Sequence, residues 1–223
     1  MREIVLDTET TGLSPADGDR VVEIGCIELI NHVATAGHFH VYINPERPMP
    51  AAAEAVHGLG DEFLADKPVF AEVAEGFLAF VGEDPLVIHN AAFDMGFLNA
   101  ELARLGRPAL PDARAIDTVA IARRKHPGAP ASLDALCRRF GIDNSTRTLH
   151  GALLDAELLA EVYLELIGGR QPGLELASTS PVARAVDVAD RVARTPRPHA
   201  ASAEEAAAHE KFLEKIADPL WRG

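Results

Sequence analysis

Two acidic side chains near the start of this 223-residue sequence are spaced as metal ligands would be. Asp7 and Glu9 are two residues apart in a segment that alternates like a β-strand, so both side chains point to one face of the strand. Two ionised carboxylates on one face repel each other, and burying them is costly without a counter-charge. A divalent cation supplies that charge, and oxygen ligands suit Mg²⁺ or Mn²⁺. The alternative is a pair of acids that flank a strand end in water.

Two more acids occupy comparable positions later in the chain. Asp94 lies in the first turn of a helix that Asn90 is predicted to cap, and Asp155 lies near the start of a helix predicted over residues 151–167. A helix N-terminus favours negative charge, which also accounts for acids at these positions. His150 precedes Asp155 by five residues, about 140° round a helix. It can therefore reach the same site only from the connecting loop.

Hydrophobic patterning predicts the elements that carry these residues. Strands are expected near residues 4–9, 20–31 and 37–44, joined by turns into an antiparallel meander. Two short strands follow at residues 86–88 and 114–118. Helices are expected over residues 51–56, 69–81, 90–105, 132–140 and 151–167, with one more ending at His126. This order predicts a mixed α/β sheet flanked by helices.

Composition narrows the function. The chain has 21 basic and 34 acidic side chains, for a net charge of −13. That balance argues against a protein that grips nucleic acid by bulk charge alone, but it leaves room for a nucleic-acid enzyme whose acids are neutralised by metal.

Cysteine content and hydropathy bear on the compartment. Cys26 and Cys137 are the only cysteines, so a disulfide framework and a Cys-ligated zinc site are excluded. No apolar run reaches the roughly 18–20 residues of a membrane span, and the acids within residues 1–20 do not suit a signal peptide. We expect reduced, buried thiols in a cytoplasmic protein without a membrane partner.

The acids fall into three ordered motifs, D-x-E, N-x-x-x-D and H-x-x-x-x-D. The segments that carry them resemble the three motifs of the DEDDh 3′–5′ exonucleases, and within that family the proofreading subunits of bacterial replicative DNA polymerases. The resemblance covers residues 3 to about 170 well and the tail weakly. It rests on residues 7–12, 89–94 and 150–156, and extends through Val56-His57-Gly58-Leu59, Asp117-Thr118 and residues 132–137.

The resemblance implies a ribonuclease-H-like fold with a mixed five-stranded sheet. It also implies that two divalent cations, Mg²⁺ or Mn²⁺, are held by Asp7, Glu9, Asp94 and Asp155. A neutral His150 would act as general base towards the attacking water. The expected reaction releases nucleoside 5′-monophosphates from a single-stranded 3′ end of DNA.

In this family the loop after the first strand and the segment before the His-Gly pair line the pocket of the terminal nucleotide. The loop offers Thr10 and Leu13, and the later segment offers Ala52 and His57. Relatives can carry an acid at the position of Ala52. Because this chain has alanine there, Ala52 would contribute only its backbone. For His57 the alternative is a helix-terminal histidine that interacts with the last carbonyls. The metal ligands Glu9 and Asp155 are expected to contact the substrate as well.

The tail changes character after about residue 170, which ends the expected exonuclease domain. Residues 171–176 fit Q-x-x-L-x-L through Gln171, Leu174 and Leu176, and resemble the short peptides that bind bacterial sliding clamps. The alternative is the frayed end of the domain. Residues 177–201 are predicted to be a flexible linker, since large apolar residues there are scarce.

A short helix is predicted to follow, because Ser202 and Glu205 form a capping-box pattern. It would run to about residue 217 and carry an apolar stripe that includes Phe212 and Leu213, with Trp221 beyond it. Such a segment, residues 202–223, is expected to fold on a partner. The resemblance suggests the catalytic (alpha) subunit of the polymerase.

The densest basic run, Arg123-Arg124-Lys125, lies at a predicted helix C-terminus. It could contact DNA phosphates, or it could be a solvated face favoured by the helix dipole.

Two rival functions remain at the level of sequence. An RNA-trimming exonuclease of the same family would share all three motifs, although it would have no use for a clamp peptide or a docking helix. A metal-independent binding module would be expected to lack at least one of the acids, and all four are present.

Overall fold

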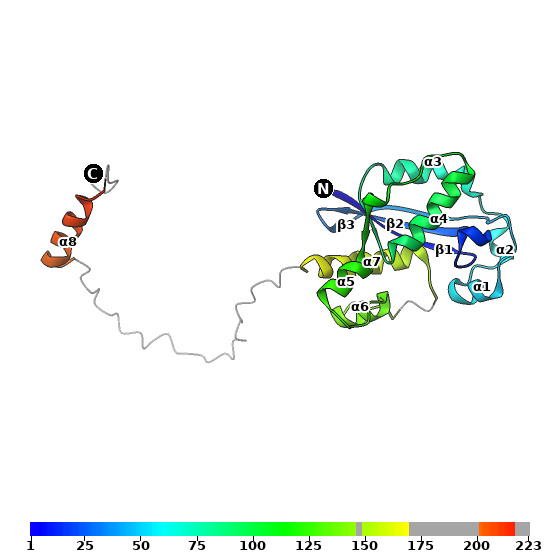
Figure 1. Ribbon diagram of the computed structural model, residues 1–223. Helices are drawn as coiled ribbons and strands as arrows, with labels where there is room; N and C mark the ends of the chain where they lie inside the picture. The colour runs from blue at the N-terminus through cyan, green and yellow to red at the C-terminus, as the bar shows by residue number, and fades with distance from the viewer. Residues whose placement is uncertain (146–148, 170–200, 217–223) are drawn as a thin grey trace, which may run out of the picture. The chain divides into compact units, whose positions relative to one another are not determined.

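The computed structural model describes residues 1–145, 149–169 and 201–216. A five-stranded sheet with the order β3-β2-β1-β4-β5 forms the centre of the larger unit (Figure 1). Three long strands are antiparallel, whereas β4 runs parallel to β1 and β5 parallel to β4. Their bounds are Arg2–Thr10 for β1, Val21–Ile30 for β2, Val33–Tyr42 for β3, Leu86–Ile88 for β4 and Ala115–Asp117 for β5. The predicted mixed five-stranded sheet is confirmed.

Helices cover both faces of this sheet. The short ones are α1 (Ala51–His57), α2 (Asp61–Leu64) and the 3₁₀ turns η1 (Pro15–Asp17) and η2 (Asp112–Arg114). The longer ones are α3 (Phe70–Val81), α4 (Ala91–Arg104), α5 (Thr118–Lys125), α6 (Leu133–Phe140) and α7 (Ala152–Ile167).

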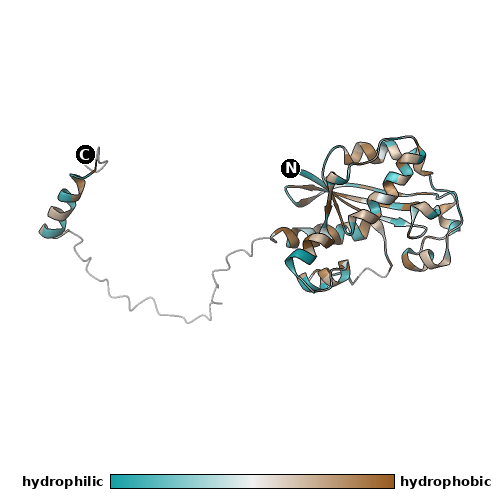
Figure 2. Cartoon of the chain, in the orientation of Figure 1, coloured by the Kyte–Doolittle hydropathy of each residue, from teal (hydrophilic) through white to brown (hydrophobic). Residues whose placement is uncertain are grey.

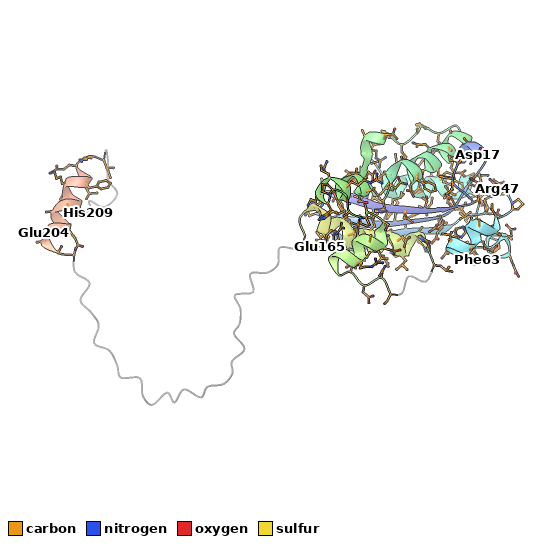
Figure 3. All side chains as sticks on the ribbon, turned by 60° about the horizontal axis from the view of Figure 1, so that its bottom comes forward. Asp17, Arg47, Phe63, Glu165, Glu204 and His209 are labelled. Atoms are coloured by element: carbon orange, nitrogen blue, oxygen red, sulfur yellow. The ribbon has the colours of Figure 1, made fainter. Side chains whose placement is uncertain are left out.

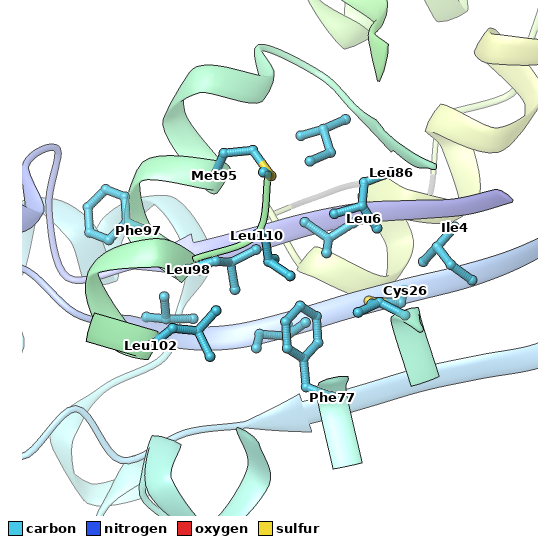
Figure 4. Close-up of a cluster of buried hydrophobic side chains, with 14 of the residues drawn as sticks. Ile4, Leu6, Cys26, Phe77, Leu86, Met95, Phe97, Leu98, Leu102 and Leu110 are labelled. Atoms are coloured by element: carbon cyan, nitrogen blue, oxygen red, sulfur yellow. The ribbon is translucent and has the colours of Figure 1, made fainter. Parts of the chain in front are cut away.

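Alternation along β1 divides the core into two clusters. Ile4 and Leu6 pack beneath α3 and α4, where Figure 4 shows them with Phe77 and Met95. Val5 points the other way and joins the cluster formed with α5, α6 and α7. Because β1 is buried on both faces, each residue that follows along the strand is directed to a known side of the sheet.

The hairpin between β2 and β3 is tighter than the sequence predicts. The expected turn covered residues 32–36, but Asn31 and His32 alone connect the two strands, and β3 begins at Val33 and ends at Tyr42. Both turn residues have positive φ, 52° and 66°. This is the backbone of a two-residue hairpin turn, which matches the twist of the paired strands.

Smaller differences are local. Asn90 precedes α4 as predicted, but its φ is 69° and its side chain makes no capping bond. Its backbone N–H instead donates to Asp117 Oδ1 at 3.2 Å. Ser132 does cap α6, by accepting from the Ala135 amide. The α2 helix and both 3₁₀ turns were not predicted, because each is too short for a periodic signal.

The second unit comprises residues 176–223, of which residues 201–216 are described. Its helix α8 spans Ala203–Leu213, ending about four residues earlier than predicted, and the predicted capping box is present: the Ser202 amide donates to Glu205 Oε2 at 2.8 Å. Figure 2 shows both hydrophilic and hydrophobic residues along α8. Leu213 is buried, whereas Phe212 is 59% exposed. The predicted clamp peptide, linker and Trp221 lie outside the described residues.

Among the described residues, no helix has the length and apolar character to cross a membrane.

Candidate active site

The D-x-E pair is directed by the alternation of β1. Asp7 and Glu9 follow Val5 in phase, so their side chains lie on the side of the sheet that α6 and α7 cover. Thr8 is in phase with the residues on the opposite face. Its hydroxyl donates to Asp94 Oδ1 at 2.7 Å, which fixes the first turn of α4 against the strand.

Close packing brings Asp155 to the same place. Asp7 pairs with Gly25 of β2, and a Cβ at Gly25 would lie 2.3 Å from the backbone of Ala152 and Leu153. Only glycine therefore allows the first turn of α7 to approach the sheet so closely. Asp155, one helical turn further on, is 4% exposed beneath this contact.

His150 reaches the acids from the loop before α7, as the spacing requires. Its Nδ1 lies 3.3 Å from Asp155 Oδ2. Ligand atoms of Glu9, His150 and Asp155 all lie within 4.8 Å of one another. The backbone N–H of His150 donates to the carbonyl of Val56 at 3.1 Å, so the loop is fastened to α1.

A cavity of about 260 Å³ opens between these groups, lined by Asp7, His150 and Asp155 together with His89 and residues 132–134. We call it the catalytic cavity. No lysine or arginine of the described residues lines it. Asp94 is held by Thr8 and does not belong to the group of closely spaced ligand atoms.

Burial and neighbouring charges raise the pKa of two of these acids, Asp7 and Asp94. Burial raises the pKa of Asp7 well above its ordinary value, and the neighbouring charges of Asp94, Glu9 and Asp155 raise it further. Burial also raises the pKa of Asp94 to about 7, although the hydrogen bond from Thr8 opposes that shift. A divalent cation would remove this penalty, and the oxygen donors are those that Mg²⁺ and Mn²⁺ prefer. The residues present therefore fit a metal site.

A second cavity, of about 590 Å³, adjoins the acids on the side of α1. It is lined by Glu9, Thr10, Leu13, Ala52 and His57, so the structure brings together every predicted substrate residue except Asp155. We call it the nucleotide pocket. Asp155 lines the catalytic cavity instead. Glu9 links the two, since it lines the pocket and belongs to the Glu9–His150–Asp155 group.

Pro50, Val56 and Phe93 also line the nucleotide pocket, and the sequence did not single them out for it. Phe93 also packs against the core cluster beneath α4. The sequence offered one signal that Phe93 lies near the site: it is in the first turn of α4, next to Asp94.

His57 has a structural bond besides its place in the pocket. Its Nδ1 accepts from the Leu59 amide at 3.0 Å rather than interacting with the last carbonyls of α1. Burial lowers the pKa of His57, and the Thr10 carbonyl opposes that shift. The imidazole is therefore neutral near pH 7, and it presents an uncharged wall to a ligand.

The loop after β1 is held in place by Asp19. Its carboxylate accepts from the Thr11 hydroxyl, the Ser14 amide and Arg47 Nη1. Figure 3 shows Arg47 near Asp17, at the end of the domain where this loop lies. Leu13 is 85% exposed at the tip of the loop, at the rim of the pocket.

Comparisons with known proteins agree with this geometry. A sequence model of the exonuclease family matches residues 4–163. DNA polymerase III subunit epsilon of Rickettsia conorii is 50% identical over 222 residues, covering 97% of this chain and 96% of the relative. The Salmonella typhimurium subunit is 46% identical, covering 99% and 97%. The chain therefore belongs to the exonuclease family and, within it, to the DNA polymerase III epsilon subunits.

Solved structures show the same fold. Exonuclease X in complex with 5′ overhanging duplex DNA has a TM-score of 0.59 and 28% identity, covering 74% of this chain and 90% of that one. The nuclease domain of 3′hExo, a DEDDh family member bound to rAMP, has a TM-score of 0.65 at 18% identity, covering 74% and 91%.

Proposed function

We propose that this chain is the proofreading 3′–5′ exonuclease of a replicative DNA polymerase III and removes mispaired 3′-terminal deoxynucleotides as 5′-monophosphates. The observation that carries the proposal is the junction at Glu9. A cavity large enough for a nucleotide meets a cluster of acids there, so a terminal nucleotide in the pocket would place its phosphate beside the acids.

The residues divide the work. Asp7, Glu9, Asp94 and Asp155 would hold two divalent cations, Mg²⁺ or Mn²⁺, whose charge stabilises the attacking and leaving oxygens of an in-line displacement. Thr8 would keep the Asp94 carboxylate oriented through its hydrogen bond.

His150 would act as the general base. Its Nδ1 faces Asp155, so the neutral imidazole that carries its proton on Nδ1 offers Nε2 as the acceptor for a proton of water. His150 is 47% exposed, which gives water access to Nε2 and the proton a way out to solvent.

The nucleotide pocket would hold the terminal nucleotide by shape. Leu13 and Ala52 offer apolar surface and His57 is neutral, so no charged side chain of these three selects one base. That suits an enzyme that must remove any mispaired nucleotide.

Residues 1–170 would form the exonuclease domain, and the tail would join it to the polymerase. Residues 171–176 would bind the sliding clamp through Gln171, Leu174 and Leu176, and residues 177–201 would act as a flexible linker. Residues 202–223 would dock on the catalytic subunit through Phe212, Leu213 and Trp221. The exposed Phe212 on a capped helix supports this docking. Deleting residues 201–223 should abolish co-elution with the catalytic subunit and leave exonuclease activity intact; retained co-elution would refute the docking.

The activity is tested with 5′-labelled single-stranded DNA and RNA of one sequence, with Mg²⁺ or with EDTA. We expect a metal-dependent ladder that shortens from the 3′ end and forms faster on DNA. Asp155→Ala should remove the ladder, whereas Asp66→Ala, which changes an acid 77% exposed on the surface, should leave it unchanged. Faster shortening of RNA would favour an RNA-trimming enzyme, and folded protein without cleavage of either strand would refute the proposal.

A further inference from the structure

Some lysine and arginine side chains in the described part of residues 1–169 make no hydrogen bond or ion pair, and we call these uncommitted. All of them lie on two helices. Elsewhere in that part, six cations pair with acids and Arg114 donates to backbone carbonyls; the six are Arg2, Arg20, Arg47, Lys67, Arg104 and Arg107. On α5 and α6, Arg123, Arg124, Lys125, Arg138 and Arg139 make no side-chain hydrogen bond or ion pair within the described residues.

One of these cations lies beside the catalytic cavity. Arg123 lines a separate cavity of about 510 Å³ together with His89, Asn90 and Ser132. His89 and Ser132 also line the catalytic cavity, so the two cavities are neighbours. We call the first one the Arg123 cavity. The helix dipole accounts for cations in the last turn of α5, but it does not account for one that lines a cavity next to the catalytic acids.

The walls of the Arg123 cavity are themselves fixed. His89 Nδ1 lies 2.9 Å from the Thr118 hydroxyl, and the Asn90 amide is bonded to Asp117. The guanidinium of Arg123 is therefore the adaptable group of this cavity, free to meet a ligand without first breaking an ion pair.

The net charge of the whole chain bears on the role of Arg123. With a net charge of −13, the protein repels a polyanion, and the acids of the active site add to that repulsion. A strand whose 3′ end enters the nucleotide pocket must carry its other phosphates past the catalytic cavity. A guanidinium can hold a phosphate by two parallel hydrogen bonds.

We propose that Arg123 binds a backbone phosphate of the substrate strand on the 5′ side of the scissile bond, with Arg124 and Lys125 adding attraction at longer range. The inference rests on the proposed exonuclease function. It adds a path for the substrate strand, from the catalytic cavity to the Arg123 cavity. The geometry favours nucleic acid as the occupant, because an uncommitted guanidinium here adjoins groups suited to phosphodiester cleavage.

The test compares two substrates. A single-stranded oligonucleotide has phosphates on the 5′ side of the scissile bond, whereas the p-nitrophenyl ester of thymidine 5′-monophosphate has none. Arg123→Gln should raise KM for the oligonucleotide about tenfold and leave its kcat nearly unchanged. Hydrolysis of the ester should not change. The slope of log(1/KM) against log[NaCl] should become shallower by about 0.7, the value for one lost phosphate contact on a single strand.

Two variants sharpen the result. Arg139→Gln removes an equally uncommitted cation on α6 that does not line the Arg123 cavity, so its KM should stay within about twofold of wild type. Arg123→Lys keeps the charge but not the two parallel hydrogen bonds, so it should recover part of the lost affinity. Equal effects of Arg123→Gln and Arg139→Gln, or an equal loss on the ester, would overturn the inference while leaving the exonuclease function in place. Wild-type protein that cleaves neither substrate would overturn both.

Discussion

The catalytic cavity and the nucleotide pocket meet at Glu9, and they differ in the charge of the side chains that line them. The catalytic cavity gathers carboxylates with no lysine or arginine of the described residues in its wall, and burial pushes the pKa of Asp7 and Asp94 upward. The nucleotide pocket is lined largely by short, apolar or uncharged groups from the loop after β1 and from α1.

This difference shows which part of the site the chain forms by itself and which part needs a cation from solution. Apart from Glu9 and Asp19, the side chains that line the nucleotide pocket carry no charge, because His57 is neutral. The catalytic cavity stores repulsion between carboxylates that a divalent cation from solution would relieve. Cleavage should therefore depend on added metal, whereas recognition of the terminal nucleotide should depend on shape.

The largest expected effect comes from removing a charge in the catalytic cavity. Asp7→Asn should lower turnover on the order of 10³-fold or more, since it removes a ligand that stabilises the transition state through metal. In EDTA the same variant should be more stable than wild type, because it removes a carboxyl group whose ionised form is disfavoured by burial and by four neighbouring acids. Activity and thermal unfolding in EDTA measure the two effects, and a variant less stable than wild type would contradict the stored repulsion.

Removing the proposed base should have the next largest effect. His150→Ala should slow turnover by about 10²–10⁴-fold, the usual contribution of a general base. Stabilisation by Mg²⁺ should survive nearly intact, because the carboxylates remain. Full activity near neutral pH would refute the base assignment. Loss of metal stabilisation would make His150 a ligand instead.

The position of His150 can be tested at Gly58, a residue that lines neither cavity. Gly58 has φ 75°, and a Cβ there would lie 2.7 Å from Leu149 Cδ1, beside the residue that carries the imidazole. Gly58→Ala should lower kcat roughly tenfold with little change in the affinity for metal. The strain of a left-handed residue should also cost about 1 kcal/mol of stability.

Gly106→Ala provides the matched control, since Gly106 has φ 65° and a Cβ there would meet nothing within 4 Å. It should cost similar stability and leave kcat unchanged. Equal kcat values for the two variants would show that the contact with Leu149 does not position His150.

The smallest effect is expected at the rim of the nucleotide pocket. Leu13→Ala should raise KM for DNA by about tenfold, as expected when a ligand covers a largely exposed leucine, and it should leave the melting temperature unchanged. Val33→Ala, at a residue 61% exposed on β3, should alter neither quantity. A fall in kcat alone would place Leu13 in the chemical step rather than in binding.

The sequence predicts those features of the site that depend on residues close together along the chain. The D-x-E spacing directs Asp7 and Glu9 correctly, because alternation along a strand needs no tertiary information. The position of His150 in a loop also follows from counting residues along a helix. The approach of α7 to Gly25 and the bond from His150 to Val56 arise between segments distant in sequence, so spacing alone carries no sign of them.

The misjudged details have the same origin. The turn at Asn31 and His32 depends on the register of two paired strands, which a single strand's pattern does not reveal. Asn90 has the residue type of a cap, but its amide bonds to Asp117 at the end of β5, which the parallel sheet brings near. Arg123 is indistinguishable from Arg124 and Lys125 in sequence, and only the folded cavity separates them.

Thermal unfolding of wild type and Asp155→Asn, during a titration with Mg²⁺ or Mn²⁺, tests whether the clustered carboxylates bind metal. Metal that binds only the folded state adds about 2.7 kcal/mol at a hundredfold excess over Kd. We predict a rise of that order for wild type and almost none for the variant. Equal shifts, or no shift in either protein, would show that the clustered carboxylates do not form a metal site.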